Sequence, residues 1–169
     1  MREWVPVSTS PRGRLVLAAV GEFGRRPYAE VTVGELARQA EVTTGALYHH
    51  FDSKIGLYAF VREDVEKRLL DRISGAVAVT DDVMAALVVG FDFAVAQGFL
   101  HILGAPPEPV DHDRLTELVA ELVESAPLGR LLTASWRAAL AAVADGVPAD
   151  QVRAALQALQ VTGAGRTAP

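Results

Sequence analysis

The chain is 169 residues long, half of them hydrophobic and 22% charged, so it can bury a substantial core and is globular rather than disordered. The absence of cysteine excludes a disulfide scaffold and a thiolate metal site. A net charge of −5 argues against a protein that coats nucleic acid nonspecifically. Residues 1–11 lack the apolar segment of a signal peptide, so we expect a cytoplasmic protein.

The first predicted helix begins at Ser10 and Pro11 and runs to about residue 25. Serine is a favourable N-cap residue, and proline suits the first helical position because its missing N–H would be unpaired there. One apolar face follows at helical spacing, formed by Leu15, Ala18, Ala19 and Phe23. Pro27 ends the helix, and residues 1–9 are expected to form a flexible arm.

A second, shorter helix is predicted after Thr32. Thr32 and Glu35 have the spacing of a capping box, in which the two side chains satisfy each other's backbone N–H groups. An apolar face then recurs at i, i+3, i+4 and i+7, formed by Val33, Leu36, Ala37 and Ala40. Glu41 and Val42 are expected to form a tight turn.

The third helix is predicted to begin at Thr43 or Thr44 and to bury Leu47 and Phe51. Its outward positions are small, aromatic or imidazole, and no carboxylate occurs among them: Thr44, Gly45, Ala46, Tyr48 and His49. A surface that lies against DNA phosphates and base edges needs small residues, hydroxyl and N–H donors, and no carboxylates. The pattern therefore predicts a helix-turn-helix that reads DNA, and an ordinary helical hairpin is the alternative.

The stretch Val42–Lys54, which reads VTTGALYHHFDSK, closely resembles the signature of the TetR family of transcriptional regulators. The helix before it, Tyr28 and the Val31–Val33 entry also resemble that family, so the resemblance covers about residues 10–60. It implies a DNA-binding regulator that forms a homodimer through its last two helices. It further implies that Thr32 lies near a phosphate. The DNA contacts that it implies are Thr43, Thr44, Gly45, Tyr48, His49 and Lys54.

Two positions depart from the family pattern. Glu41 stands in the turn where many relatives have a small residue, often glycine. Gly34 stands where many have arginine or another polar residue, which removes a possible groove contact. We therefore expect Arg2, Arg12 and Arg14 to carry more of the DNA affinity.

The charge distribution agrees with a DNA-binding segment at the N-terminal end of the chain. Residues 1–54 carry seven basic and six acidic residues, whereas the remaining 115 carry nine basic and fifteen acidic ones. The acidity thus lies outside the proposed DNA-facing part. A head of such weak charge should make few phosphate contacts, and its affinity for DNA should fall as salt rises.

A long helix is predicted from Ser53 to about Ala78, because its apolar residues step by four. Residues 83–104 are apolar enough to suggest a membrane span. Asp92, Gln97 and His101 argue against a span because ionisable groups are costly in lipid. We expect a helix buried in a helical bundle, with Gly98 as a candidate break.

Three further helices are predicted in the last third of the chain. One begins at Asp111 or Asp113, one covers Pro127–Val143 and one covers Ala149 to about Gln160. The fold class is thus all-α with about nine helices. We expect a DNA-binding domain over residues 1–53 and a helical ligand-binding and dimerisation domain over residues 54–169.

The second domain carries the residues that could hold a small apolar effector. Hydrophobic walls with a few orienting polar groups are typical of ligand sites, and five residues offer that mixture: Phe91, Asp92, Phe99, His101 and Trp136. The alternative is that the aromatic residues fill a core and that Asp92 lies at a helix surface. With an effector site, the protein would be a repressor that the effector releases from DNA.

No pattern points to catalysis or to a bound metal. The chain has no Gly-x-Ser-x-Gly elbow, no phosphate-binding glycine loop and no His-Glu-x-x-His motif, so we expect neither an enzyme nor a cofactor. His49 and His50 point about 100° apart on a helix and would chelate one ion poorly. Helix capping explains the acids of the triplet Asp111–Asp113. The remaining alternative is a small-molecule-binding or protein-interaction module without DNA binding.

Overall fold

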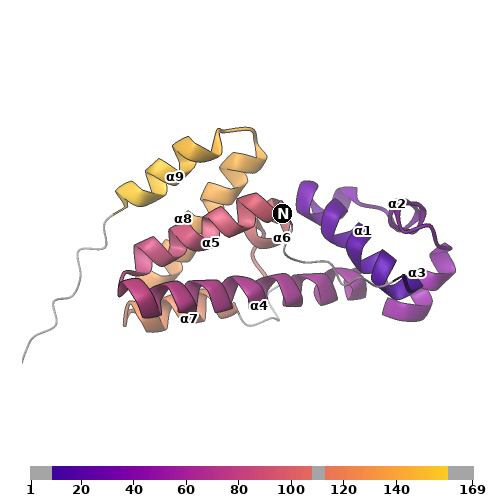
Figure 1. Ribbon diagram of the computed structural model, residues 1–169, viewed down its shortest axis with the longest axis horizontal. Coiled ribbons are helices and arrows are strands. Elements are labelled where there is room, and N and C mark those ends of the chain that lie inside the picture. Colours follow the sequence, from indigo (N-terminus) through magenta and orange to yellow (C-terminus); the bar gives the residue numbers. More distant parts are fainter. Residues whose placement is uncertain (1–8, 108–112, 160–169) are drawn as a thin grey trace, which may run out of the picture.

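The computed structural model describes residues 9–107 and 113–159, and within them the chain is all-α, as expected (Figure 1). Nine α-helices and one short 3-10 helix, Tyr28–Glu30, make up the described part. The first three helices form the N-terminal head: α1 (Pro11–Arg25), α2 (Val33–Gln39) and α3 (Thr44–Phe51). The rest of the described chain comprises α4 (Lys54–Thr80), α5 (Val83–Gln97), α6 (Leu100–Gly104), α7 (Arg114–Leu122), α8 (Ala126–Ala144) and α9 (Ala149–Ala158).

The head is closed by apolar side chains from all three of its helices. Leu15, Phe23, Leu36 and Leu47 are at most 1% exposed and share one core. The Ser10 hydroxyl caps α1 by accepting a hydrogen bond from the N–H of Gly13 at 3.1 Å. The predicted start of the first helix is therefore confirmed, and α1 ends at Arg25 as expected.

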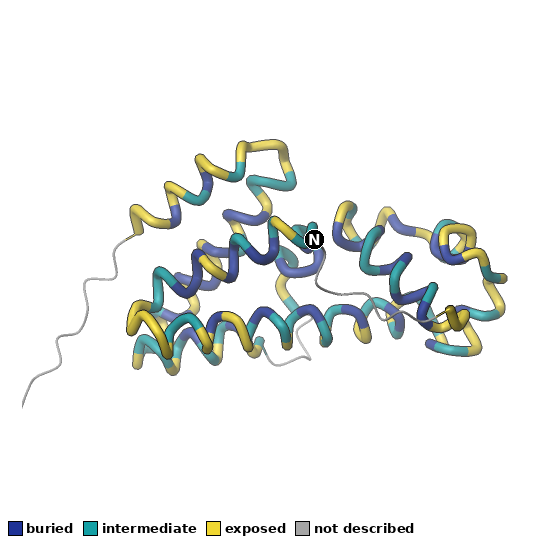
Figure 2. The backbone as a smooth tube through the Cα atoms, viewed as in Figure 1, coloured by how far each residue is buried: buried dark blue, intermediate teal, exposed yellow. Residues whose placement is uncertain are grey.

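The 27-residue helix α4 links the head to the remaining helices, and α5 and α7 lie along its length in Figure 1. Ser53 caps it, accepting from the N–H of Gly56 at 3.0 Å. Its buried positions recur about once per turn, as Figure 2 shows, and are Leu57, Val61, Val65, Leu69 and Ile73. The step of four read from the sequence is thus confirmed, although Val77, the next apolar residue in the series, is only half-buried.

The apolar stretch after α4 folds as two helices rather than one. Gly98 adopts a left-handed backbone conformation, with φ of 74°, and ends α5 before the short α6 begins. Trp136 of α8 is fully buried, and its indole N–H donates to the backbone oxygen of Leu87 on α5 at 2.9 Å. Among the described residues, no helix combines the length and apolar character needed to cross a membrane.

A glycine–glycine contact joins the head to the rest of the molecule. Gly24, near the end of α1, is buried against the backbone of the α5–α6 junction. A Cβ atom placed on Gly24 would overlap the carbonyl oxygen of Gly98. Helix α1 can therefore pack this closely against the α5–α6 junction only because position 24 has no side chain.

The Thr133 hydroxyl on α8 is an unusual buried group. The residue is 0% exposed, and its Oγ1 finds no hydrogen-bond partner in the described part of the chain. A buried hydroxyl without a partner destabilises the folded state. Thr133→Val, which exchanges the hydroxyl for a methyl group, should raise the free energy of unfolding in urea by about 1 kcal/mol. Thr133→Ser keeps the hydroxyl and should not raise the free energy of unfolding. A valine variant less stable than the wild type would show that the hydroxyl is paired.

Candidate nucleic-acid interface

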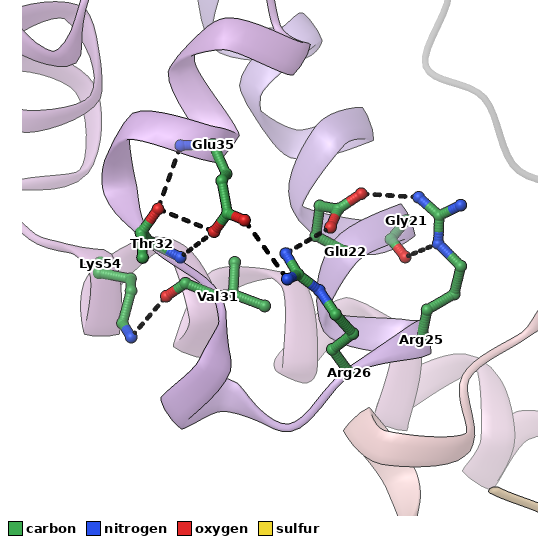
Figure 3. A network of polar contacts seen from close by, with 8 residues as sticks. All are labelled: Gly21, Glu22, Arg25, Arg26, Val31, Thr32, Glu35 and Lys54. Carbon is green, nitrogen blue, oxygen red and sulfur yellow. Dashed lines mark hydrogen bonds and ion pairs between the residues drawn. The ribbon is translucent and has the colours of Figure 1, made fainter.

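The N-terminus of α2 is held by the predicted capping box (Figure 3). The backbone N–H of Glu35 donates to the Thr32 hydroxyl at 3.3 Å, and the Thr32 backbone N–H donates to the Glu35 carboxylate at 2.9 Å. The Thr32 hydroxyl also donates to that carboxylate, at 2.8 Å. These bonds from Thr32, together with one from Arg26, lower the pKa of Glu35 to about 2. Thr32 is exposed at the head surface, but its polar groups are engaged in capping.

The turn between α2 and α3 is a Schellman motif. The N–H of Glu41 donates to the carbonyl of Arg38 at 3.2 Å, and the N–H of Val42 donates to that of Ala37 at 3.0 Å. This motif places the residue after the helix C-cap in the left-handed region, where glycine is the usual choice. Glu41 occupies that position with φ of 54°. The departure from the family pattern therefore leaves the turn geometry intact but introduces backbone strain.

Replacing Glu41 with glycine should stabilise the head. A non-glycine residue in the left-handed region destabilises the folded state by about 1–2 kcal/mol. Glycine avoids this strain, but its greater conformational freedom in the unfolded chain offsets part of the gain. We expect Glu41→Gly to raise the free energy of unfolding by roughly 0.5–1 kcal/mol in urea denaturation. Glu41→Ala is the matched control, because it removes the carboxylate but keeps the strain. Equal stabilisation by both variants would contradict the strain account.

Helix α3 presents the expected face outward. Thr43 is its N-cap, with the hydroxyl accepting from the N–H of Ala46 at 3.2 Å. Leu47 and Phe51, at 0% and 7% exposure, anchor the opposite side in the head core. The exposed residues of the helix and its cap are Thr43, Thr44, Gly45, Tyr48 and His49. Tyr48 is 53% exposed, so a large apolar ring stands at the surface of the head.

The two histidines of α3, His49 and His50, lie next to each other on the helix. The rings of His49 and His50 meet edge to face, with centroids 4.9 Å apart. The described residues contain no group of three or more His, Cys, Asp or Glu side chains that could hold a metal ion. Asp111 and His112 lie outside the described residues. Asp113 caps α7 and forms an ion pair with Arg137 at 2.7 Å.

Arg14 and Lys54, the cations expected to contact DNA, are both bonded to backbone carbonyls of the head. The Nε of Arg14 donates to the Ala40 carbonyl at 2.9 Å. The ammonium of Lys54 donates to the carbonyls of Tyr28 at 2.9 Å and Val31 at 2.8 Å. Sequence reasoning missed these contacts, because they join positions 23–26 residues apart with no motif to signal them.

Arg12 and Arg2 are the other two arginines expected to add DNA affinity. The Arg12 guanidinium lies over the rings of Phe51 and Phe60, 5.2 and 4.6 Å from their centroids. Arg12 therefore packs on aromatic rings of α3 and α4. Arg2 lies outside the described residues.

The predicted effector residues are placed in two different environments. Phe91, Phe99 and Trp136 are at most 3% exposed and belong to the common hydrophobic core. The sequence left two positions open for Asp92, a cavity shared with His101 or a helix surface, and the residue lies at the surface of α5 with a side chain 45% exposed. Its carboxylate accepts from the Nε of Arg153 on α9 at 2.9 and 3.0 Å. The alternative reading of Asp92, a surface position on the helix, is the one that the structure supports.

A polar groove between α7 and α8 was not foreseen from the sequence. It has a volume of about 420 Å³ and is lined by Asp113, Thr116, Glu117, Arg130, Ala134 and Arg137. Asp113 accepts two bonds from the Arg137 guanidinium, at 2.7 and 2.8 Å, across the groove. Asp113, the N-cap of α7, and Glu117 lie four residues apart, and Arg130 and Arg137 lie seven apart on α8, so a helical charge spacing could have indicated the groove.

Comparison with known proteins agrees with this geometry. Residues 15–60, which cover most of α1 to the first turns of α4, match the family model described as "Bacterial regulatory proteins, tetR family". A TetR-family transcriptional regulator from Pectobacterium atrosepticum has a TM-score of 0.65 at 23% identity, over 86% of this chain and 87% of its own. A tetR family transcription regulator from Shewanella sp. PV-4 has a TM-score of 0.63 at 19% identity, over 88% and 95%. At these identities the likeness shows the fold.

Two curated relatives are similar in sequence. The nucleoid occlusion factor SlmA of Alteromonas mediterranea is 29% identical over 122 residues, which are 69% of this chain and 62% of that protein. The HTH-type transcriptional activator FasR of Mycolicibacterium smegmatis is 35% identical over 86 residues, 48% of this chain and 39% of its own. The matches therefore span only about two fifths to three fifths of these relatives.

A capped α2, a left-handed turn and a partly exposed α3 on a three-helix head define a helix-turn-helix. Residues 15–60 match the TetR family, and the fold of the described chain is that of solved TetR-family regulators.

Proposed function

We propose that the chain is a DNA-binding transcriptional regulator and that α3 is the helix that enters the major groove. The observation that carries this proposal is the outward face of α3, which has no carboxylate and exposes Tyr48. The proposed contacts are Thr43, Thr44, Gly45, Tyr48 and His49. Small residues at the start of the helix allow close approach to the DNA backbone, and hydroxyl and imidazole groups supply hydrogen bonds to phosphates and base edges.

Tyr48 should contribute most to operator binding. Its exposed ring can pack on a sugar or a thymine methyl while its hydroxyl donates to a phosphate. Tyr48→Ala should weaken operator binding by roughly 1–3 kcal/mol, measured by titrating labelled promoter DNA at fixed salt. Val79→Ala is the control, because Val79 is 85% exposed near the C-terminal end of α4. Operator binding unchanged by Tyr48→Ala, with the helical circular dichroism retained, would remove α3 from the interface.

The regulator should bind as a homodimer through α8 and α9. One helix-turn-helix head contacts too little DNA for tight specific binding, so a second head is needed. The large apolar residues of these helices, among them Leu140, Val152 and Leu156, face the protomer core. Small residues and one leucine remain on the outside, exposed and at helical spacing: Leu131, Ala134, Ser135, Ala138 and Ala141 on α8, and Ala154, Ala155 and Ala158 on α9. Small outward residues let the helices of two protomers approach closely.

We propose repression as the mode of action, with release by a small apolar effector. A dimer on the promoter excludes other proteins from the same DNA, which makes repression the simpler outcome. The effector would bind among α5, α6, α7 and α8, where Phe91, Phe99 and Trp136 are packed, so these helices must separate to admit it. A ligand that does this must bind the open form more tightly than the closed one.

A reporter gene behind the chain's own promoter tests the mode of action, because one relative is named an activator. Higher expression without the regulator supports repression, and lower expression supports activation. A thermal-shift screen of apolar metabolites tests the effector. A compound that stabilises the protein but leaves operator affinity unchanged would show a binding site without a switch.

A further inference from the structure

The helix that precedes the DNA-reading helix is too short to hold itself in place. Helix α2 has seven residues, and isolated helices of that length are unstable in water. Its position must therefore come from contacts with its neighbours. Leu36 and Ala37 bury its inner face, and besides the capping box two cations from other helices donate to backbone carbonyls at or next to its ends.

Arg14 of α1 holds the C-terminal end of α2. Its Nε donates to the carbonyl of Ala40, the C-cap residue, at 2.9 Å, and its Nη1 donates to the Thr9 carbonyl at 2.6 Å. Carbonyls at a helix C-terminus carry partial negative charge, so a guanidinium is a strong donor for them. Ala40 directly precedes Glu41, the strained residue of the turn that leads into α3.

Lys54 of α4 holds the N-terminal end. Its ammonium donates to the carbonyls of Tyr28 and Val31 and lies 3.9 Å from the centroid of the Tyr28 ring. Val31 is joined to Thr32, the N-cap of α2, and Figure 3 shows the Lys54 side chain reaching the Val31 carbonyl beside the capping box. Two carbonyl oxygens and an aromatic face thus surround one ammonium group.

We propose that Arg14 and Lys54 are positioning residues that clamp α2 at its two ends and thereby set where α3 stands on the head. For its consequence on DNA the proposal rests on the proposed function. It assigns to Lys54 a role other than the phosphate contact that the family resemblance implies. The side chains act through α2 and the turn, and their positive charge serves the intramolecular bonds.

Swaps that conserve charge separate the two roles. A phosphate contact depends chiefly on charge, so lysine and arginine can substitute for each other in part. A clamp depends on geometry. Lysine at position 14 cannot reach two carbonyls with a planar fork, and arginine at position 54 cannot place a compact ammonium between two oxygens. Arg14→Lys and Lys54→Arg keep the long aliphatic stems and the net charge.

The test uses the full-length chain and its operator. Both swaps should weaken operator binding by about tenfold or more, while the slope of affinity against salt stays within about half a unit of the wild type. Backbone amides of residues 33–39 should exchange with deuterium at least about tenfold faster in the free protein. Arg12→Lys is the matched control, because the Arg12 guanidinium lies over two rings and not on carbonyls of α2. Its α2 amides should exchange like those of the wild type.

Two results would overturn the clamp. The first is wild-type amide exchange in α2 for both swaps. The second is wild-type operator affinity for both swaps, combined with a salt slope lowered by about one unit in Arg14→Met and Lys54→Met, which is the signature of direct phosphate contacts. Amide exchange needs no DNA. If the wild-type protein binds no operator, the proposed function fails while the exchange data still decide whether the clamp exists.

Discussion

Replacing Gly24 with alanine should both destabilise the protein and abolish tight operator binding. The new Cβ would overlap the carbonyl oxygen of Gly98 and crowd its carbonyl carbon, and neither is the end of a flexible side chain. Overpacking of a buried site costs about 1–3 kcal/mol, and a backbone obstacle places this change at the upper end of that range. To relieve the overlap, α1 must move away from the α5–α6 junction, and the head moves with it. Two displaced heads would no longer fit the same DNA.

Urea denaturation and operator titration at fixed salt measure the two effects of Gly24→Ala. Gly75→Ala is the matched control, because Gly75 lies within the helix α4 and an added Cβ there meets nothing within 4 Å. It should raise the free energy of unfolding by about 1 kcal/mol, the usual gain for alanine over glycine in a helix. Wild-type stability and affinity in Gly24→Ala would mean that the head does not depend on this contact.

An arginine on the outer face of α8 should separate the dimer and remove most of the DNA affinity. Ala138 is exposed in the protomer, so Ala138→Arg leaves the core intact while placing a long charged side chain between two closely packed helices. With the two heads unlinked, operator affinity should fall by about a hundredfold or more, because the second head no longer binds at high effective concentration. Ala139 would be the wrong position, since it is 8% exposed and its substitution would disturb the protomer itself.

Light scattering coupled to size exclusion at micromolar concentration measures the assembly state. The wild type should be a dimer and Ala138→Arg a monomer with unchanged helical circular dichroism. Ala78→Arg, at an exposed position of α4, adds the same charge elsewhere and should remain a dimer. A monomeric wild type that still binds its operator tightly would contradict the dimer proposal.

The local structure of the head could be read from the sequence because each signal involves neighbours within four residues. Ser10, Thr32 and Ser53 were recognised as N-caps and the structure confirms them, whereas the sequence left Thr43 and Thr44 open and Thr43 is the N-cap. The buried face of α3 follows from one turn of helical spacing between Leu47 and Phe51. Such patterns depend on backbone geometry alone and survive whatever the tertiary packing adds.

The contacts that hold the head in place could not be read in this way. Arg14 and Ala40 are 26 residues apart, and Gly24 meets Gly98 through two backbones, for which no side-chain pattern exists. A glycine near a helix end usually marks the end of the helix. The role of Gly24 in close packing depends on the tertiary contact between α1 and the α5–α6 junction, which the sequence does not show. The direction in which Lys54 points depends on the same tertiary arrangement.

The effector residues show a different limit. Aromatic residues in an apolar helix look the same in a sequence whether they line a pocket or fill a core, and Phe91 and Trp136 are packed at 1% and 0% exposure. The sequence could not place Asp92, because an acid within such a helix fits both a buried polar group and a surface position. Its partner, Arg153, lies 61 residues later on α9, which brings the carboxylate to the surface as half of an ion pair.

Selection of binding sites from fragmented genomic DNA tests sequence-specific binding most directly. The wild-type protein and Tyr48→Ala would be used side by side, and the recovered fragments sequenced and footprinted. We expect the wild type to enrich an inverted repeat, with half-sites separated by about one helical turn or a multiple of it. We also expect that enrichment fails with Tyr48→Ala. Recovery of fragments without a common site by a folded, dimeric wild-type protein would contradict sequence-specific binding.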